Sequence, residues 1–321
     1  MFEQPGWNRE SLIAEIPPLQ WHDPCLAESE QWQAYRHFYQ LDFAGHAEVS
    51  HFAGMLKTPE YDISVQIWRQ PGARGTALLV HGYYDHTGIY GSLIEFCLSQ
   101  GLDVVIFDLP GHGLSSGERA AIDSFQQYDE VFSLLVQQTE VHLSGPLYVF
   151  GQSTGGAIVI NYLLKRQLTP EHSPFKAVTL FAPLIRPKGW TKARVLHSIL
   201  SLVIRRIKRD FNPNSADGRF LKFIAEHDPL QPKHLSVRWV GALRQWVPFI
   251  ELSPKCDVAL NIVQGDADNT VDWCHNLEII EQKFPNKRVF MLPGGQHHVV
   301  NESVENRIKV YQQVANWLNL G

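Results

Sequence analysis

The chain has 321 residues, of which 44% are hydrophobic and 19% are charged, as in a globular protein with a sizeable core. Its net charge of −5 excludes a general electrostatic attraction to nucleic acid. No run of about 18 uninterrupted apolar residues occurs, so we expect no membrane-spanning helix. The first residues also lack the basic and apolar regions of a secretory signal, and we therefore expect a cytoplasmic protein.

The four cysteines show no paired spacing and no grouping with histidine that would suit a metal. They are Cys25, Cys97, Cys256 and Cys274. Such isolated thiols are typical of buried or incidental cysteines in a reducing compartment. The sequence therefore predicts neither a disulfide nor a metal site.

Residues 1–42 are rich in Trp, Pro, Gln and Glu and carry no strong periodicity. We interpret them as an irregular N-terminal extension that contains a helix around residues 28–39 and packs on the rest of the protein. Residues 46–54 and 61–69 then alternate apolar with polar side chains. This alternation predicts an antiparallel pair of strands at the edge of a sheet.

From residue 76 onward, short apolar runs typical of buried strands alternate with segments that have a helical apolar period. The expected strands are 76–80, 103–108, 146–150, 176–181, 257–263 and 287–292, and the expected helices are 92–99, 122–142, 157–165 and 304–318. This order predicts an α/β fold with a mostly parallel central sheet and helices on both faces. In such a fold, functional groups gather at the carboxyl ends of the strands.

One segment breaks this alternation, because about seventy residues, 183–253, separate two of the expected strands. A structureless loop of that length is uncommon in a compact domain. We therefore expect a helical insert at 183–253 that serves as a lid. The remaining segments, 43–182 and 254–321, are expected to form the α/β core.

Within the insert, Thr191 is expected to cap a helix over residues 192–209. The apolar face of this helix consists of Val195, Leu196, Ile199, Leu200, Val203 and Ile207. The stretch 186–209 holds eight Lys or Arg and no Asp or Glu. Two interpretations stay open: the helix buries its apolar face on the body of the protein, or it contacts an anionic membrane surface or takes up lipid. A membrane contact would make the protein peripheral at the inner face of the membrane.

The segment Gly151-Gln152-Ser153-Thr154-Gly155 is a G-x-S-x-G motif between an expected strand and an expected helix. In this context the motif holds a nucleophilic serine on a sharp, strained turn. The helix begins directly behind Ser153, so the Thr154 N–H is free to stabilise negative charge that forms there. The second backbone donor is expected at Tyr83, which follows a buried strand and the pair His81-Gly82.

A serine nucleophile needs a base, and His297 and His298 follow the last expected strand at the same edge of the sheet. The acid that orients the base should follow the preceding strand, where Asp266, Asp268 and Asp272 stand. The spacing from the strand end favours Asp268, with Asp266 as the alternative, whereas Asp272 is expected to cap the next helix. The resulting chain order, Ser…Asp…His, is that of α/β-hydrolases.

A set of motifs runs through most of the chain. They are His81-Gly-Tyr-Tyr-Asp-His-Thr-Gly-Ile-Tyr90, Phe107-Asp-Leu-Pro-Gly-His-Gly-Leu-Ser-Ser-Gly117, Ser124-Phe125 with Tyr128-Asp129, 151–155, 265–268 and Gly294-Gly-Gln-His-His-Val-Val-Asn-Glu302. Together they resemble the monoacylglycerol lipase/lysophospholipase branch of the α/β-hydrolase superfamily. The resemblance covers about residues 60–318 and implies an α/β-hydrolase fold with an inserted lid. The chain departs from the family at Tyr83-Tyr84, where a glycine is usual, and at Ile89, where an arginine is usual.

The resemblance implies Ser153 as nucleophile, Asp268 as acid and His297 as base, with the N–H groups of Tyr83 and Thr154 as the oxyanion hole. It implies no metal and no organic cofactor. The expected activity is hydrolysis of a lipid monoester, a monoacylglycerol or a lysophospholipid, through an acyl-enzyme. The residues expected to contact this substrate are Tyr84, Leu196, Ile199 and Leu200. The alternatives are a general carboxylesterase, a thioesterase or acyltransferase on the same triad, and a non-catalytic membrane-surface binding protein on this fold.

Overall fold

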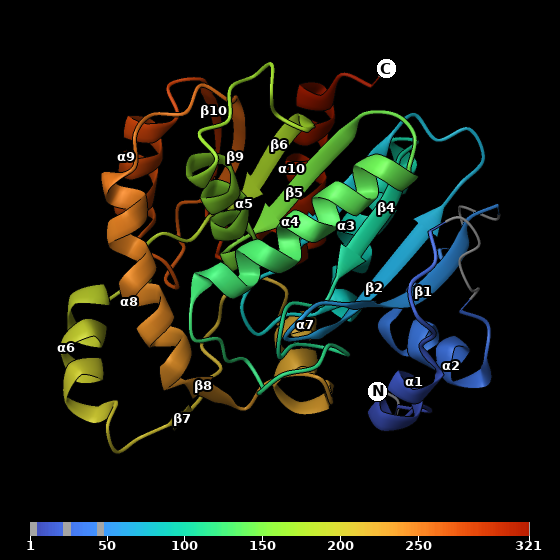
Figure 1. Ribbon diagram of the computed structural model, residues 1–321, viewed down its shortest axis with the longest axis horizontal. Coiled ribbons are helices and arrows are strands. Elements are labelled where there is room, and N and C mark those ends of the chain that lie inside the picture. The colour runs from blue at the N-terminus through green and yellow to red at the C-terminus, as the bar shows by residue number, and fades with distance from the viewer. Residues whose placement is uncertain (1–4, 22–26, 44–47, 321) are drawn as a thin grey trace.

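The computed structural model describes residues 5–21, 27–43 and 48–320, and within them a central sheet of eight strands is flanked by helices (Figure 1). The strands of this sheet are β1 (Ser50–Lys57), β2 (Asp62–Arg69), β3 (Thr76–Val80), β4 (Asp103–Phe107), β5 (Leu147–Gln152), β6 (Phe175–Phe181), β9 (Leu260–Gly265) and β10 (Lys287–Leu292). Their spatial order is β1-β2-β4-β3-β5-β6-β9-β10. β1 pairs with β2, and β2 with β4, in antiparallel fashion, whereas all the later neighbours are parallel. The prediction of a mostly parallel sheet with an antiparallel pair at one edge is confirmed.

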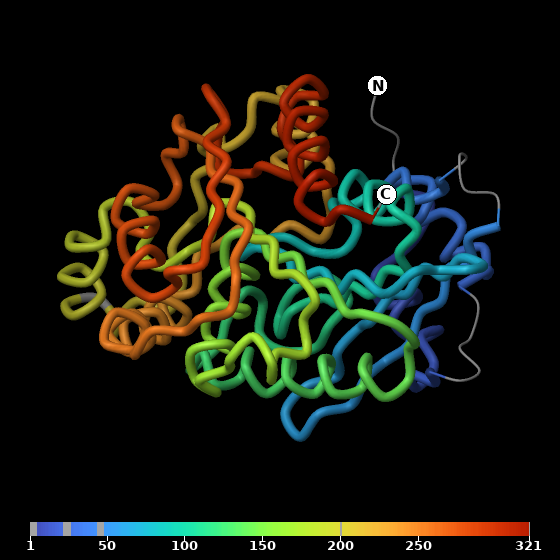
Figure 2. Tube along the Cα trace, turned by 90° about the horizontal axis from the view of Figure 1, so that it is seen from above, coloured from blue at the N-terminus to red at the C-terminus, as the bar shows by residue number. Residues whose placement is uncertain are grey.

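Helices cover both faces of the sheet, as predicted (Figures 1 and 2). One face is covered by α4 (Phe125–His142), α5 (Thr154–Lys165) and α9 (Trp273–Lys283), and the other by α3 (Gly91–Ser99) and α10 (Val304–Leu318). Each face has its own apolar core, because successive side chains of a strand point to opposite sides. In β3, for example, Leu78 enters the core under α4 and α5, and Leu79 enters the core under α3 and α10.

The N-terminal extension packs on the body of the protein. Its helices are α1 (Arg9–Glu15) and α2 (Glu30–Tyr39), and the side chain of Ser29 caps α2 by accepting from the Trp32 N–H. Residues 17–19 run beside the edge strand β1, where the Leu19 N–H donates to the Met55 carbonyl at 3.0 Å and the Met55 N–H donates to the Pro17 carbonyl at 2.7 Å. The extension therefore contributes both a helical layer and a cover for the sheet edge.

The segment between β6 and β9 forms a group of short elements, of which α6, α8, β7 and β8 lie below β5 and β6 in Figure 1. They are α6 (Trp190–Leu200), β7 (Arg206–Lys208), α7 (Gly218–Lys222), a single π-helical turn η2 (Phe223–His227), β8 (His234–Ser236) and α8 (Val237–Leu252). α6 packs on α8, and β7 pairs with β8 in an antiparallel two-stranded sheet. We call residues 183–253 the insert.

The prediction of a helix over 192–209 is wrong at both ends. The helix starts at Trp190, and its N-cap is Gly189 in a left-handed conformation at φ 73°, not Thr191. It stops at Leu200, and the chain then turns into β7, in which Ile207 stands opposite Leu235. The run of β-branched residues after position 202 favours an extended strand once a partner strand is present, and helical periodicity alone does not reveal that partner.

Asp129 fixes α5 to its neighbours. Its carboxylate accepts hydrogen bonds from Arg166 Nη1 at 2.8 Å, Lys165 Nζ at 2.9 Å and Asn161 Nδ2 at 3.1 Å. Asn161 in turn accepts from Trp246 Nε1 of α8 at 3.0 Å. Burial opposes ionisation, but the two cations outweigh burial and hold the pKa of the Asp129 carboxyl below its usual range. One buried carboxylate thus links α4, α5 and the insert.

Asp129→Asn keeps the size of this side chain and removes its charge, so we expect the free energy of unfolding at pH 7 to fall by about 1–3 kcal/mol. The pKa in the folded protein is lower than the unfolded value of about 3.9, so this contribution is present above that value and is lost as the pH falls through the folded pKa. Urea titrations should show a constant difference from wild type near neutral pH that shrinks below about pH 4. Glu130→Gln, an exposed charge on the same helix, is the control. A difference that persists unchanged to about pH 3 would contradict this account.

Candidate active site

Ser153 stands on the sharp turn between β5 and α5. Its backbone angles, φ 52° and ψ −112°, are unfavourable for a residue with a side chain. A Cβ built on Gly155 would lie 2.0 Å from the carbonyl oxygen of Val80 at the end of β3, so only glycine allows the first turn of α5 to come this close. The Ser153 N–H donates to the Phe181 carbonyl of β6 at 2.8 Å. Contacts with the strands on both sides therefore hold the strained turn.

The side chains of Ser153, His297 and Asp268 form a hydrogen-bonded chain. Ser153 Oγ lies 2.8 Å from His297 Nε2, and His297 Nδ1 lies 2.8 Å from Asp268 Oδ2. Because a carboxylate only accepts, Nδ1 carries the proton and Nε2 is left to accept the hydroxyl proton of Ser153. All three side chains are buried. Such an arrangement can convert a serine hydroxyl into a nucleophile.

The carboxylate of Asp268 is held by the loop that follows β9. Its Oδ1 accepts from the Thr270 N–H at 2.8 Å and the Val271 N–H at 3.1 Å, and its Oδ2 also accepts from Gln264 Nε2 at 3.2 Å. Burial alone would raise the pKa of Asp268, but His297 and these donors outweigh burial and lower it. Asp268 therefore stays ionised and can stabilise a protonated imidazole.

The other two aspartates of this loop are engaged elsewhere. Asp266 accepts from the Gly294 N–H at 2.6 Å, which ties the loop after β9 to the loop after β10. Asp272 is the N-cap of α9, as predicted, and accepts from the His275 N–H at 3.4 Å. Of the three candidate acids, only Asp268 lies within hydrogen-bond distance of His297.

Two backbone N–H groups near Ser153, those of Tyr83 and Thr154, have no hydrogen-bond acceptor among the described residues. Thr154 is the first residue of α5, where N–H groups have no partner within the helix. Tyr83 follows Gly82, which lies so close to the nucleophile that a Cβ built on it would be 3.4 Å from the Cβ of Ser153. Free donors of this kind can stabilise an oxyanion.

A buried carboxylate that the sequence analysis did not single out, Asp85, holds the loop that carries Tyr83. Its Oδ2 accepts from the Gly82 N–H at 3.2 Å and from the Tyr90 hydroxyl at 2.9 Å. His298 Nε2 lies 3.2 Å from the same oxygen, although the ring is not oriented for a linear hydrogen bond. Burial would raise the pKa of Asp85, but the charge of His298 and these donors hold it well below its usual range. The only sequence signal for this contact is the adjacent pair of histidines.

The two tyrosine rings of this loop contact the insert. The Tyr83 hydroxyl donates to the Ala120 carbonyl at 2.7 Å, and its ring stacks on Trp239 of α8 with 3.9 Å between centroids. Tyr84 has a left-handed backbone at φ 75°, and its ring lies 3.9 Å from the guanidinium carbon of Arg209. The insert therefore packs directly on the segment that carries the Tyr83 N–H.

The interpretation that α6 buries its apolar face on the body of the protein is wrong, because this face is exposed. Leu196 is 49% and Ile199 65% exposed, and Leu202 and Val203 in the following turn are 93% and 82% exposed. The side chain of Leu200 lies outside the described residues. The structure thus places Leu196 and Ile199 on an outer surface of the insert.

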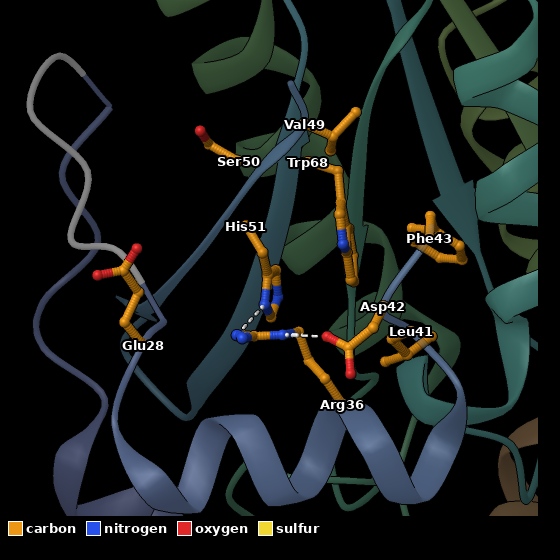
Figure 3. Close-up of a pocket in the computed structure, with 9 residues that line it drawn as sticks. All are labelled: Glu28, Arg36, Leu41, Asp42, Phe43, Val49, Ser50, His51 and Trp68. Carbon is orange, nitrogen blue, oxygen red and sulfur yellow. Dashed lines mark hydrogen bonds and ion pairs between the residues drawn. The ribbon is translucent and has the colours of Figure 1, made fainter. Parts of the chain in front are cut away.

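A separate cavity of about 240 Å³ lies beside β1 and β2, between the sheet edge and α2 (Figure 3). Its lining residues are Glu28, Arg36, Leu41, Asp42, Phe43, Val49, Ser50, His51 and Trp68. Arg36 Nε donates to Asp42 at 2.8 Å, and the His51 ring stacks on Trp68. Burial lowers the pKa of His51 to about 3, so this ring is neutral beside Arg36. β2, β4 and β3 separate this cavity from the strand that leads to Ser153.

Within the described ranges, no group of three or more His, Cys, Asp or Glu side chains could hold a metal ion. Cys97 and Cys256 are buried free thiols and Cys274 is an exposed one, whereas Cys25 lies outside the described residues. None of the helices that the structure describes is both long and apolar enough to cross a bilayer.

Comparisons with known proteins identify the family and the fold of the chain. A family model described as serine aminopeptidase, S33, matches residues 71–304. The chain is 35% identical over 213 residues to the phospholipase YtpA of Bacillus subtilis, an alignment that covers 64% of this chain and 80% of that protein. It is 27% identical over 264 residues to the monoglyceride lipase of Homo sapiens, covering 78% and 85%. A crystal structure of a soluble variant of monoglyceride lipase from Saccharomyces cerevisiae, in complex with a substrate analogue, has a TM-score of 0.71 at 20% identity, covering 83% of this chain and 94% of that one. These matches confirm the expected α/β-hydrolase fold.

A fluorophosphonate probe, which reacts with activated serines, distinguishes the two adjacent histidines. We expect His297→Ala to slow labelling of Ser153 by at least about 1,000-fold, because the proton acceptor is lost. His298 is a neighbour of Asp85, and His298→Ala leaves both backbone donors in place. Its labelling rate should therefore fall by less than the roughly 100- to 1,000-fold that follows when one oxyanion donor is removed. Labelling rates from stopped time courses provide the measurement. Equal losses in the two variants would mean that His297 is not the base.

Proposed function

Because the chain belongs to the serine aminopeptidase S33 family of α/β-hydrolases, we propose that it is a serine hydrolase that cleaves lipid monoesters, either monoacylglycerols or lysophospholipids. The observation that carries this proposal is the hydrogen-bonded chain from Ser153 through His297 to Asp268, with 2.8 Å at both links. The free N–H groups of Tyr83 and Thr154 beside it add the donors that acyl transfer requires. The similarity to monoglyceride lipases and to a phospholipase supports a lipid ester as the substrate.

In the first half-reaction, Ser153 Oγ attacks the acyl carbonyl carbon while His297 Nε2 takes the hydroxyl proton. The carbonyl oxygen becomes an oxyanion and accepts from the Tyr83 and Thr154 N–H groups, each of which lowers the barrier by about 2.7–4 kcal/mol. Protonated His297, stabilised by Asp268, then gives its proton to the leaving alcohol oxygen as the ester C–O bond breaks. The products of this half-reaction are the free alcohol and an acyl group on Ser153.

In the second half-reaction, water takes the place of the alcohol. His297 accepts a proton from the water, whose oxygen attacks the acyl carbonyl, and the same two N–H groups stabilise the second oxyanion. Collapse of this intermediate returns the proton to Ser153 and releases the fatty acid. Every group in both steps comes from this chain, the substrate or water.

Ser153→Ala should abolish ester hydrolysis, with a loss of about 10⁶-fold in kcat, because the attacking atom is gone. Its Tm should stay within about 2 °C of wild type, since the change deletes a single hydroxyl from a residue that caps nothing. Fatty-acid release should be measured on a panel with one acyl chain presented as monoacylglycerol, lysophospholipid and thioester, together with a short-chain ester and an amino-acid anilide.

The panel separates the proposal from its rivals. Fastest turnover of the short-chain ester would indicate a general carboxylesterase, and fastest turnover of the thioester would indicate a thioesterase. Cleavage of the anilide alone would indicate a peptidase. Ester hydrolysis that survives in Ser153→Ala would remove the nucleophile assignment.

We also propose that α6 and the turn after it contact an anionic membrane surface. Ile199, Leu202 and Val203 form part of an exposed apolar surface, and the stretch 186–209 contains no acidic residue. Apolar side chains exposed on a basic helix are the features that bind an amphipathic helix to an anionic bilayer. Such a contact would bring the insert to the surface from which a lipid monoester is taken.

Co-sedimentation with vesicles tests this contact in Ser153→Ala protein, which cannot consume lipid. The double change Leu202→Asp and Val203→Asp should weaken binding to phosphatidylglycerol-containing vesicles by at least about 10-fold, because apolar area is lost and like charges are introduced. Val141→Asp on α4 is the matched control, since Val141 is also exposed, at 67%, but lies outside the insert. Equal weakening in the control, or unchanged binding in the double variant, would refute the contact.

A further inference from the structure

Arg209 of the insert lies over the loop that carries the Tyr83 N–H. Its guanidinium stands between two aromatic rings, with Cζ 3.9 Å from the centroid of Tyr84 and 4.3 Å from that of Phe211. Its Nη1 donates to Gln231 Oε1 at 2.8 Å, and its backbone N–H donates to the Lys233 carbonyl at 3.0 Å. Stacking on the two rings and the hydrogen bond from Nη1 therefore fix the plane of the guanidinium.

The opposite edge of this guanidinium has no partner among the residues that the structure describes. Within the described ranges, no carboxylate lies within 4 Å of Arg209, and its hydrogen bonds from the guanidinium come from Nη1 alone, to Gln231 and to the Pro232 carbonyl at 3.4 Å. In Arg186 the same two groups are used, because its Nε and Nη2 donate to the two carboxylate oxygens of Glu251 at 2.6 and 2.8 Å. A partly buried cation with an unused bidentate edge is suited to an anion supplied from outside, and arginine binds phosphate in this way.

A series of contacts connects Arg209 with the residues around Ser153. Tyr84 directly follows Tyr83, the two rings are 4.1 Å apart, and the preceding Gly82 lies against Ser153. The strained φ of 75° at Tyr84 places the ring that supports the guanidinium. In a lysophospholipid with its acyl group on the terminal glycerol carbon, three carbons separate the ester oxygen from the phosphate oxygen, so an anion site close to the loop that carries the Tyr83 N–H is where that phosphate would lie.

We propose that Arg209 binds the phosphate of a lysophospholipid head group through Nε and Nη2. This inference rests on the proposed lipid-ester hydrolase function and narrows its substrate class from lipid monoesters in general to anionic lysophospholipids. A neutral monoacylglycerol leaves the guanidinium edge unpaired. Arg209 acts in substrate binding and takes no part in the proton transfers at Ser153.

The test compares kcat/KM for lysophosphatidylglycerol and for monoacylglycerol with the same acyl chain. Wild type should favour the lysophospholipid, and Arg209→Gln should reduce the ratio of the two values by about 10- to 100-fold, mainly through KM, because charged hydrogen bonds are lost. Arg209→Lys should restore part of the ratio, since it keeps the charge but not the bidentate edge. Arg206→Gln, which removes an exposed arginine that pairs with Glu118, is the control and should leave the ratio unchanged.

Other outcomes separate the possible failures. A ratio that is unchanged in Arg209→Gln, with Ser153 still labelled by a fluorophosphonate, would overturn the head-group site but not the hydrolase. Turnover of neither lipid by wild type would overturn the proposed function itself. Strong inhibition of wild type by inorganic phosphate below about 1 mM, an affinity that a phosphate bound without its lipid should not reach, would indicate a site for the free anion instead. Binding of lysophosphatidylglycerol to Ser153→Ala, weakened at least about 10-fold by adding Arg209→Gln, provides the confirmation without catalysis.

Discussion

The close approach of α5 to the end of β3 determines the geometry of the whole site. Gly155 lies against the Val80 carbonyl, with no room for a Cβ, and this contact forces the chain at Ser153 into its strained turn. The same contact leaves the first N–H of α5 free and brings it close to the loop that follows β3. Because β9 and β10 are parallel to β5, the loops after them end at the same edge of the sheet and bring Asp268 and His297 to the serine.

Polar links then connect this edge of the sheet to the insert and to the N-terminal extension. His86 Nε2 lies 2.8 Å from Asp228 Oδ2 of the insert, and the hydroxyl of Tyr39 from α2 donates to the other oxygen of Asp228 at 2.7 Å. Burial alone would lower the pKa of His86, but Asp228 outweighs burial and raises it. With the stacking of Tyr83 on Trp239, these contacts make the loop that carries Tyr83 a junction of three parts of the chain. The surroundings of Ser153 are therefore held by segments far apart in the sequence.

The sequence predicted the strands at 76–80 and 287–292 at their observed bounds, because turn-forming residues such as glycine and proline stand on both sides of each segment. It also predicted that Ser153, Asp268 and His297 meet, and the structure brings their side chains within hydrogen-bond distance, since the order of strands determines which loops meet. It failed for the helix over 192–209, where a partner strand overrides helical periodicity. It also missed the contact of Asp85 with His298, which joins residues more than two hundred positions apart and leaves no local pattern. The preference of a segment for helix or strand can be predicted from the sequence, whereas the distant residue that pairs with a given strand or side chain cannot.

The short stretch 17–19 has a role that its irregular sequence conceals. By hydrogen bonding to Met55, it occupies the outer edge of β1, which would otherwise present free N–H and C=O groups. Exposed strand edges recruit strands from other molecules. Loss of the extension would open this edge to pairing between molecules, and it would also remove the contact of Tyr39 with Asp228. The irregular start of the chain thus covers an edge to which a strand of another molecule could otherwise pair.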